Sequence, residues 1–132
     1  MPSSIFEDDP SIPATERLFR RIPATWVDWD EQGNAAISSA AFKDEELSIT
    51  IESVLTIAGR APEDVIRNYP RYGLAAITAG HARSLNQAVA RDPEPEEPAH
   101  GVVYGQKKRR GIGGKLRDGA EWVVRPTKSE TG

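Results

Sequence analysis

Apolar and polar side chains alternate most clearly at residues 47–51, where Ser48 and Thr50 separate three aliphatic residues. A repeat of two residues that is rich in β-branched side chains predicts a strand with one buried face. A second strand is predicted at residues 18–22, and Pro23 ends it because proline lacks a backbone donor. We predict further short strands at residues 73–79, 87–90 and 100–104, and near Trp122.

Helical patterns are shorter and fewer than strand patterns. Residues 61–64 predict a helix start, because proline suits the first helical position and acidic side chains favour the positive end of the helix dipole. Pro70 ends this helix. A helical turn is predicted at residues 80–85, whereas residues 35–42 and 53–58 fit either a helix or a strand. The mixture predicts an α+β fold, a mainly antiparallel sheet of short strands with two or three short helices.

The chain of 132 residues has the length of one domain. Residues 1–14 contain three prolines, three serines and three acidic residues, which predicts a flexible N-terminal tail. We assign residues 15–126 to a single α+β domain and residues 127–132 to a polar C-terminal tail. Within the domain, residues 92–98 contain three prolines and predict an extended loop.

Cysteine is absent from the sequence, which excludes zinc fingers, iron–sulfur sites, thiolate nucleophiles and disulfides. The two histidines, His81 and His100, lack the spacing typical of metal ligands, so we expect neither a metal site nor a cofactor. No apolar run approaches about 18 residues. The N-terminus also lacks a positively charged signal sequence. We therefore expect a cytoplasmic protein that does not contact a membrane.

Charge is distributed unevenly along the chain, whose formal net charge is −3. Residues 107–117 form a basic segment with six cationic side chains and no acidic one. These cations are Lys107, Lys108, Arg109, Arg110, Lys115 and Arg117. Clustered cations attract anionic partners, so we predict that the basic segment binds a partner protein or a nucleic acid. It does not match a phosphate-binding P-loop, because Leu116 stands where that motif requires serine or threonine.

Two tryptophans add a second candidate binding feature. Trp26 and Trp29 lie close together in an acidic segment, and half-exposed tryptophans are typical of protein interfaces. We include both among the candidate binding residues, with packing in the core as the alternative. The acidic loop at residues 92–98 and the basic segment have opposite charges, which would also allow a homo-oligomer.

A candidate catalytic set consists of Arg20, Arg21, Ser38, Ser39 and His100. Neighbouring strand residues point to opposite faces, so we expect one of the two arginines to point inward, toward a carboxylate or a ligand phosphate. In an enzyme, an arginine and a serine would hold phosphate while His100 transfers a proton, partnered by a serine or Glu97. No Gly-x-Ser-x-Gly motif surrounds either serine, so a hydrolase triad has no support.

Four segments resemble a family of small bacterial proteins of unknown function, and the resemblance spans about residues 16–125. They are Leu18–Pro23, Ser38–Phe42, Gly73–Gly80 and Asp92–Val103. This resemblance implies no activity. The order of an early-strand arginine and a later serine is also similar to ADP-ribosyltransferase-like and RES-type folds. Such folds place a Glu-x-Glu motif in their site, whereas Glu94-Pro95-Glu96 lies in the proline-rich loop.

The absence of a complete catalytic motif favours a non-enzymatic binding or accessory module of a bacterial cell. Two alternatives stay open. One is a nucleotide-handling enzyme with an ADP-ribosyltransferase-like or RES-like site, and the other is a toxin, antitoxin or immunity-type partner protein. The enzyme hypothesis predicts that the arginines, the serines and His100 meet in one pocket.

Overall fold

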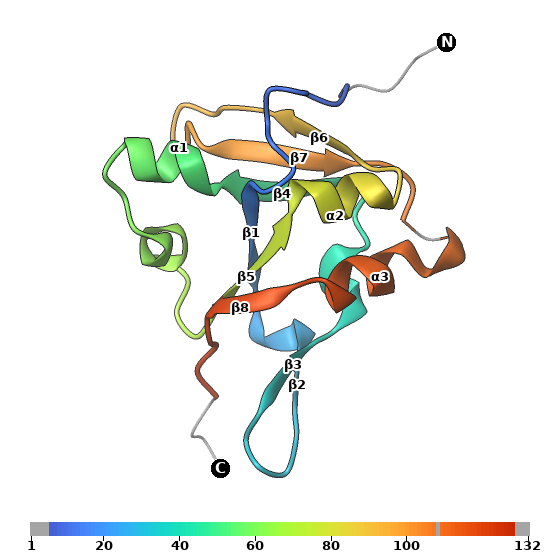
Figure 1. Ribbon diagram of the computed structural model, residues 1–132. Coiled ribbons are helices and arrows are strands. Elements are labelled where there is room, and N and C mark those ends of the chain that lie inside the picture. Colours follow the sequence, from blue (N-terminus) through green and yellow to red (C-terminus); the bar gives the residue numbers. More distant parts are fainter. Residues whose placement is uncertain (1–5, 108, 129–132) are drawn as a thin grey trace.

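Six strands form one antiparallel sheet in the computed structural model, which describes residues 6–107 and 109–128 (Figure 1). In sheet order they are β6 (Ala88–Arg91), β7 (His100–Tyr104), β4 (Glu46–Ile51), β1 (Arg17–Ile22), β5 (Gly73–Thr78) and β8 (Glu121–Val124). A separate hairpin consists of β2 (Val27–Trp29) and β3 (Ala35–Ile37). The hairpin extends away from the sheet (Figure 1).

The helices are short. The α-helices among the described residues are α1 (Glu52–Ile57), α2 (Ala79–Ser84) and α3 (Ile112–Asp118). The 3₁₀ helices of the same residues are η1 (Ala24–Trp26), η2 (Ser39–Phe42), η3 (Pro62–Ile66) and η4 (Arg109–Gly111). The predicted α+β fold, with a mainly antiparallel sheet and few short helices, is confirmed.

Alternation along β1 divides the buried side chains between the two faces of the sheet. Leu18 and Ile22 point into the larger core, to which α2, α3 and η2 also contribute. Phe19 points into the smaller core on the opposite face, where it clusters with Leu55 of α1 and Val65 of η3. Successive residues of β1 therefore reach two different surfaces of the protein.

The segment before β1 packs against the edge of the sheet at β6. The backbone N–H of Asp9 donates to the carbonyl of Val89 at 2.8 Å, and the carboxylate of Asp8 accepts from the N–H of Val89 at 2.9 Å. Ile12 is fully buried in the larger core. The predicted tail of residues 1–14 therefore includes residues that contact the domain, because they fill the unpaired edge of β6.

The two ambiguous segments have different outcomes. Residues 35–42 form β3 followed by η2, and residues 53–58 belong mainly to α1. The carboxylate of Glu16 accepts from the backbone N–H and the hydroxyl of Ser53 at 3.0 and 2.5 Å, which anchors the first turn of α1. The helix predicted from residue 61 is the 3₁₀ helix η3. Among the described residues, no helix combines the length and the apolar character needed to cross a membrane.

Candidate functional site

Lys107, the first cation of the basic segment, faces the protein interior. Its residue is 2% exposed, and its ammonium group donates to the carbonyls of Glu45, Val103 and Gly105 at 3.0, 2.9 and 3.0 Å. Burial lowers the pKa of Lys107 to about 8, so the group remains mostly charged at neutral pH. All three donors of Lys107 thus bind the protein itself, and its role in binding a partner stays a prediction.

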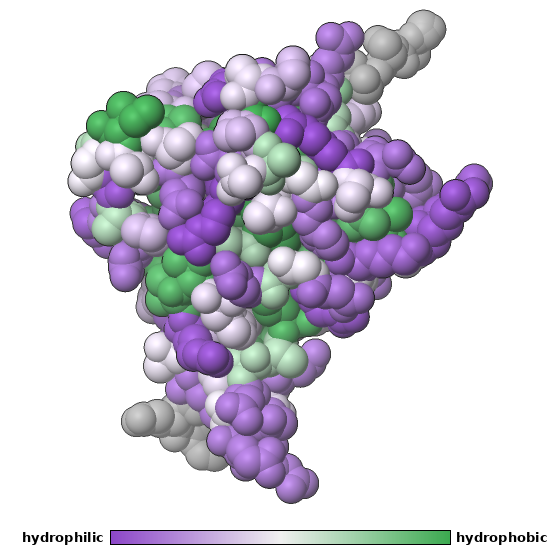
Figure 2. Space-filling model, in the orientation of Figure 1, coloured by the Kyte–Doolittle hydropathy of each residue, from purple (hydrophilic) through white to green (hydrophobic). Residues whose placement is uncertain are grey.

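Three other cations of the segment face solvent. Arg109, Arg110 and Lys115 are exposed, and no described carboxylate forms an ion pair with any of them. Arg117 differs, because its guanidinium pairs with the carboxylate of Asp118 at 3.0 Å. We call the three exposed cations the basic surface. Figure 2 shows a hydrophilic projection over the segment that leads into α3, on the right of the view. Lys108 lies outside the described residues.

A turn with unusual backbone angles presents the basic surface. Arg110 and Gly111 are consecutive left-handed residues, with φ of 58° and 64°, directly before α3. This conformation costs a residue with a side chain about 1 kcal/mol. Beyond the turn, a Cβ on Gly113 would lie 3.0 Å from Cγ of Lys43 and 3.3 Å from the carbonyl of Phe42. The small glycine therefore lets α3 pack closely on η2 while the turn stands out from the body.

Trp26 and Trp29 are half-buried and pack against the larger core. The guanidinium carbon of Arg20 lies 5.4 Å from the ring centroid of Trp26, and the ammonium of Lys128 lies 5.7 Å from that of Trp29. Both tryptophan rings thus have cationic neighbours within the protein. Their role in partner binding stays a prediction.

Arg20 and Arg21 point to opposite faces of the sheet, as their neighbouring positions on β1 require. Arg20 donates to the carbonyls of Ala41 and Ser48, both at 3.0 Å, and its guanidinium lies 3.4 Å from the carboxylate of Asp44. Arg21 instead lies 4.3 Å from the ring centroid of Tyr69. Arg20 is therefore the inward arginine, and protein groups bind its guanidinium.

The two predicted serines do not reach the surface on which Arg21 lies. Ser38 caps η2, where its hydroxyl accepts a backbone N–H at 3.2 Å, and Ser39 is part of that helix. Both arginines and His100 line a small cavity of about 30 Å³, but the serine in its wall is Ser48. The two arginines and His100 thus meet in one cavity, as predicted, but Ser38 and Ser39 do not reach it, because η2 packs on the other face of the sheet.

A larger cleft of about 360 Å³ opens on the face of the smaller core, between the sheet, η3 and the β6–β7 loop. Arg21 and Tyr69 line one part of it. In another part, the guanidinium of Arg60 binds both carboxylate oxygens of Glu97 at 2.6 and 2.8 Å. This bidentate contact lowers the pKa of the Glu97 carboxyl. The guanidinium of Arg60, which lies in the cleft near the β6–β7 loop, is therefore already paired.

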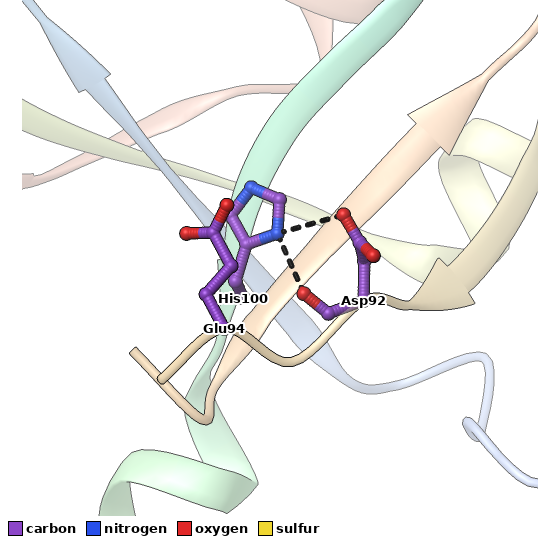
Figure 3. Close-up of side chains that lie close together, drawn as sticks. All are labelled: Asp92, Glu94 and His100. Carbon is purple, nitrogen blue, oxygen red and sulfur yellow. Dashed lines mark hydrogen bonds and ion pairs between the residues drawn. The ribbon is translucent and has the colours of Figure 1, made fainter. Parts of the chain in front are cut away.

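His100 lines the same cleft and has Asp92 as its partner (Figure 3). Its Nδ1 lies 2.8 Å from the main-chain carbonyl oxygen of Asp92 and 3.2 Å from the Oδ2 of that residue. The predicted partners were a serine or Glu97, but the pairing of β6 with β7 places Asp92 opposite His100. The second histidine, His81, connects α2 to α3 through a 2.8 Å hydrogen bond with the carbonyl of Lys115.

Several residues in the cleft or in contact with it were not among the predicted site residues. Asp92 had a usable signal, because it and His100 flank a loop between two predicted strands, and a hairpin would place them opposite each other. Tyr69 and Arg60 had none. Their place in the cleft depends on how η3 folds over the sheet, which no local pattern specifies.

No family model, no curated protein and no solved structure gives a significant match to this chain. The resemblance to small bacterial proteins therefore stays a prediction. The function of the chain has to be argued from the geometry and the charges of its own residues.

Proposed function

We propose that the chain is a binding module that docks an acidic segment of a partner protein on the basic surface. One observation carries the proposal: Arg109, Arg110 and Lys115 are exposed, and none of them pairs with a described carboxylate. Arginine binds carboxylates with two parallel hydrogen bonds, and lysine adds a point charge. Lys43, which is exposed beside α3, extends the same positive region.

Arginines elsewhere in the described residues are commonly paired. Arg17 binds Glu52 at 2.8 Å, Arg60 binds Glu97 at 2.6 Å, Arg83 binds Asp8 at 2.9 Å and Arg91 binds Asp9 at 3.2 Å. Carboxylates therefore pair with many arginines of the described chain, whereas none of the described carboxylates forms an ion pair with Arg109, Arg110 or Lys115. Unpaired cations of one sign raise the association rate and the specificity for an anionic partner.

Two observations favour a protein over a nucleic acid as the partner. The chain carries a net charge of −3, so the rest of its surface repels a polyphosphate. The depression beside α3 is lined by residues such as Ser39, Lys43 and Gly113 and by no aromatic ring on which a base could stack. The bacterial, cytoplasmic setting expected from the sequence is part of this proposal.

The test is a fluorescence anisotropy titration with a short, labelled glutamate-rich peptide. The test variant is Arg109→Gln/Arg110→Gln/Lys115→Gln. The control is Arg67→Gln/Arg71→Gln/Arg125→Gln, which removes the same charge from exposed arginines elsewhere. We expect the test variant to lose about tenfold in affinity, since three surface charges at about 0.5 kcal/mol each contribute about 1.5 kcal/mol together. The control should lose far less.

Two outcomes would contradict the proposal. Equal losses in the two variants would mean that the peptide responds to net charge alone. Tighter binding of a DNA duplex than of the peptide at the same salt concentration, with a steep loss on adding salt, would identify a nucleic-acid site instead. Circular dichroism should show that both variants keep the fold, because the changed side chains are exposed.

A further inference from the structure

We propose that the β6–β7 hairpin binds a divalent transition-metal ion through His100, Asp92 and Glu94, independently of the basic surface. Each of the three residues offers a ligand atom, and these atoms lie within 4.8 Å of one another. Figure 3 shows the imidazole of His100 with Asp92 and Glu94 around it. The donor set consists of one imidazole nitrogen and two carboxylate oxygens, all on a single hairpin.

Backbone pairing fixes two of the three ligands relative to each other. The register of β6 and β7 pairs Arg91 with Gly101, and the next N–H, that of Asp92, donates to the carbonyl of His100 at 3.0 Å. Nδ1 of His100 lies 3.2 Å from Oδ2 of Asp92, which is close to the separation of two ligand atoms on one metal. Without a metal, Nδ1 carries the ring proton, because the main-chain carbonyl of Asp92 at 2.8 Å only accepts. A bound ion would replace this proton on Nδ1, and the ring proton would then reside on Nε2.

The third ligand belongs to a constrained turn. The N–H of Glu94 donates to the carbonyl of Glu97 at 3.1 Å, and the N–H of Glu97 donates to the carbonyl of Glu94 at 3.0 Å. Pro93 and Pro95 flank Glu94 and restrict the backbone on both sides of it. Ligand atoms on one metal lie about 3–4 Å apart, given bonds of about 2.1 Å. A small rotation of the exposed Glu94 side chain suffices to reach that spacing.

The charge around the cluster favours a cation. Neither Asp92 nor Glu94 forms an ion pair with a lysine or arginine of the described chain. Glu97 differs, because Arg60 neutralises it. Two carboxylates beside an imidazole therefore lack a permanent counter-charge, and a bound cation would supply one. A protonated His100 is the competing counter-charge, and it would need no metal.

The donor types define the class of ion. Imidazole suits zinc, copper, iron and nickel, and carboxylates suit manganese, whereas calcium and magnesium prefer oxygen ligands alone. Three protein ligands leave coordination positions open to solvent or to a small ligand. Those positions adjoin the cleft of about 360 Å³ that Arg21 and Tyr69 also line. The site would thus place an ion at one wall of a cavity that already has an aromatic and a cationic group.

The test is isothermal titration calorimetry of the untagged, chelator-treated chain with zinc and with manganese chloride. We expect one bound ion per chain. His100→Gln and Glu94→Gln should each lower the affinity by about tenfold or more, because each removes a ligand. Glu96→Gln is the matched control: it removes the same charge from the same exposed loop, but Glu96 is outside the cluster.

Three results would overturn the metal site. The first is no binding of either ion at millimolar concentration. The second is an equal loss of affinity in Glu96→Gln and Glu94→Gln, which would indicate general attraction to an acidic loop. The third is tighter binding of calcium or magnesium than of zinc, which would exclude the imidazole as a ligand. Thermal unfolding of each variant without metal checks that the fold is kept. A rise in the melting temperature of the wild type on adding metal, absent in His100→Gln, would support the site.

Discussion

The basic surface and the cleft both contain arginines, but the arginines of the two regions differ in whether protein groups compensate their charge. In the cleft, Arg60 is bound to Glu97 and Arg21 lies on Tyr69. Glu94, which also lines the cleft, and Asp92 beside His100 have no lysine or arginine as an ion-pair partner among the described residues. On the basic surface, the cations are the groups without a partner. The pairing of charges, more than their number, therefore distinguishes a surface that can bind a charged ligand.

A substitution of Lys107 should have the largest effect, because this residue belongs to the basic segment in the sequence but is buried and paired in the structure. Lys107→Met should lower the free energy of unfolding by about 3 kcal/mol, since three interior carbonyls lose their donor. Arg109→Met, at an exposed position, should change it by less than about 0.5 kcal/mol. Urea unfolding followed by circular dichroism measures both. Similar losses in the two variants would contradict the assigned difference between them.

Substitution of Arg60, the paired arginine of the cleft, should lower the free energy of unfolding by less than the Lys107 variant does, and the effect should depend on pH. Arg60→Met removes the bidentate contact with Glu97 and should cost about 1–2 kcal/mol at pH 7. The folded-state pKa of Glu97 lies below the ordinary glutamate value of 4.5. Its contribution is therefore present above that value and is lost as the pH falls through the lower, folded-state pKa. Urea unfolding at pH 7 and at pH 3 should show a difference between wild type and variant that shrinks in acid. A difference that stays constant would rule out the ion pair as its cause.

A substitution in the left-handed turn of the basic surface should have the smallest effect on the free energy of unfolding, and it should raise this free energy instead of lowering it. Arg110→Gly relieves an unfavourable φ of 58° and should raise the free energy of unfolding by about 0.5 kcal/mol. The same variant should bind the glutamate-rich peptide less tightly, because it removes one cation. Thermal unfolding and anisotropy measured on one preparation compare the two effects. A loss of stability would mean that the Arg110 side chain makes contacts that support the fold.

The fold was largely predictable because its strands have local signals. The alternation at residues 47–51 corresponds to β4, the segment 18–22 before Pro23 to β1, and the apolar run at residues 73–79 to β5. The packing of the segment before β1 was not predictable. Ile12 and Asp9 are held by contacts with residues far along the chain, such as the bond between Asp9 and Val89, and composition alone made this segment resemble a tail.

The site was less predictable than the fold, for a different physical reason. The sequence does not distinguish the six cations of the basic segment from one another. In the structure, Lys107 is buried just after β7, and Arg117 pairs with Asp118. Ser38 and Arg21 were both predicted site residues, but they lie on opposite faces of the sheet, because the sheet separates η2 from the cleft. Direction and pairing depend on tertiary packing, which residue types and spacing do not specify.

The docking of an acidic segment on the basic surface is tested most directly by a ¹⁵N–¹H correlation NMR titration of the chain with the glutamate-rich peptide. It measures the basic surface and the cleft in one experiment. The proposed docking surface predicts that shift changes concentrate at residues 109–118 and at Lys43, while Arg21, Tyr69 and His100 stay unchanged. Changes centred on the cleft, or spread evenly over the exposed arginines, would contradict it.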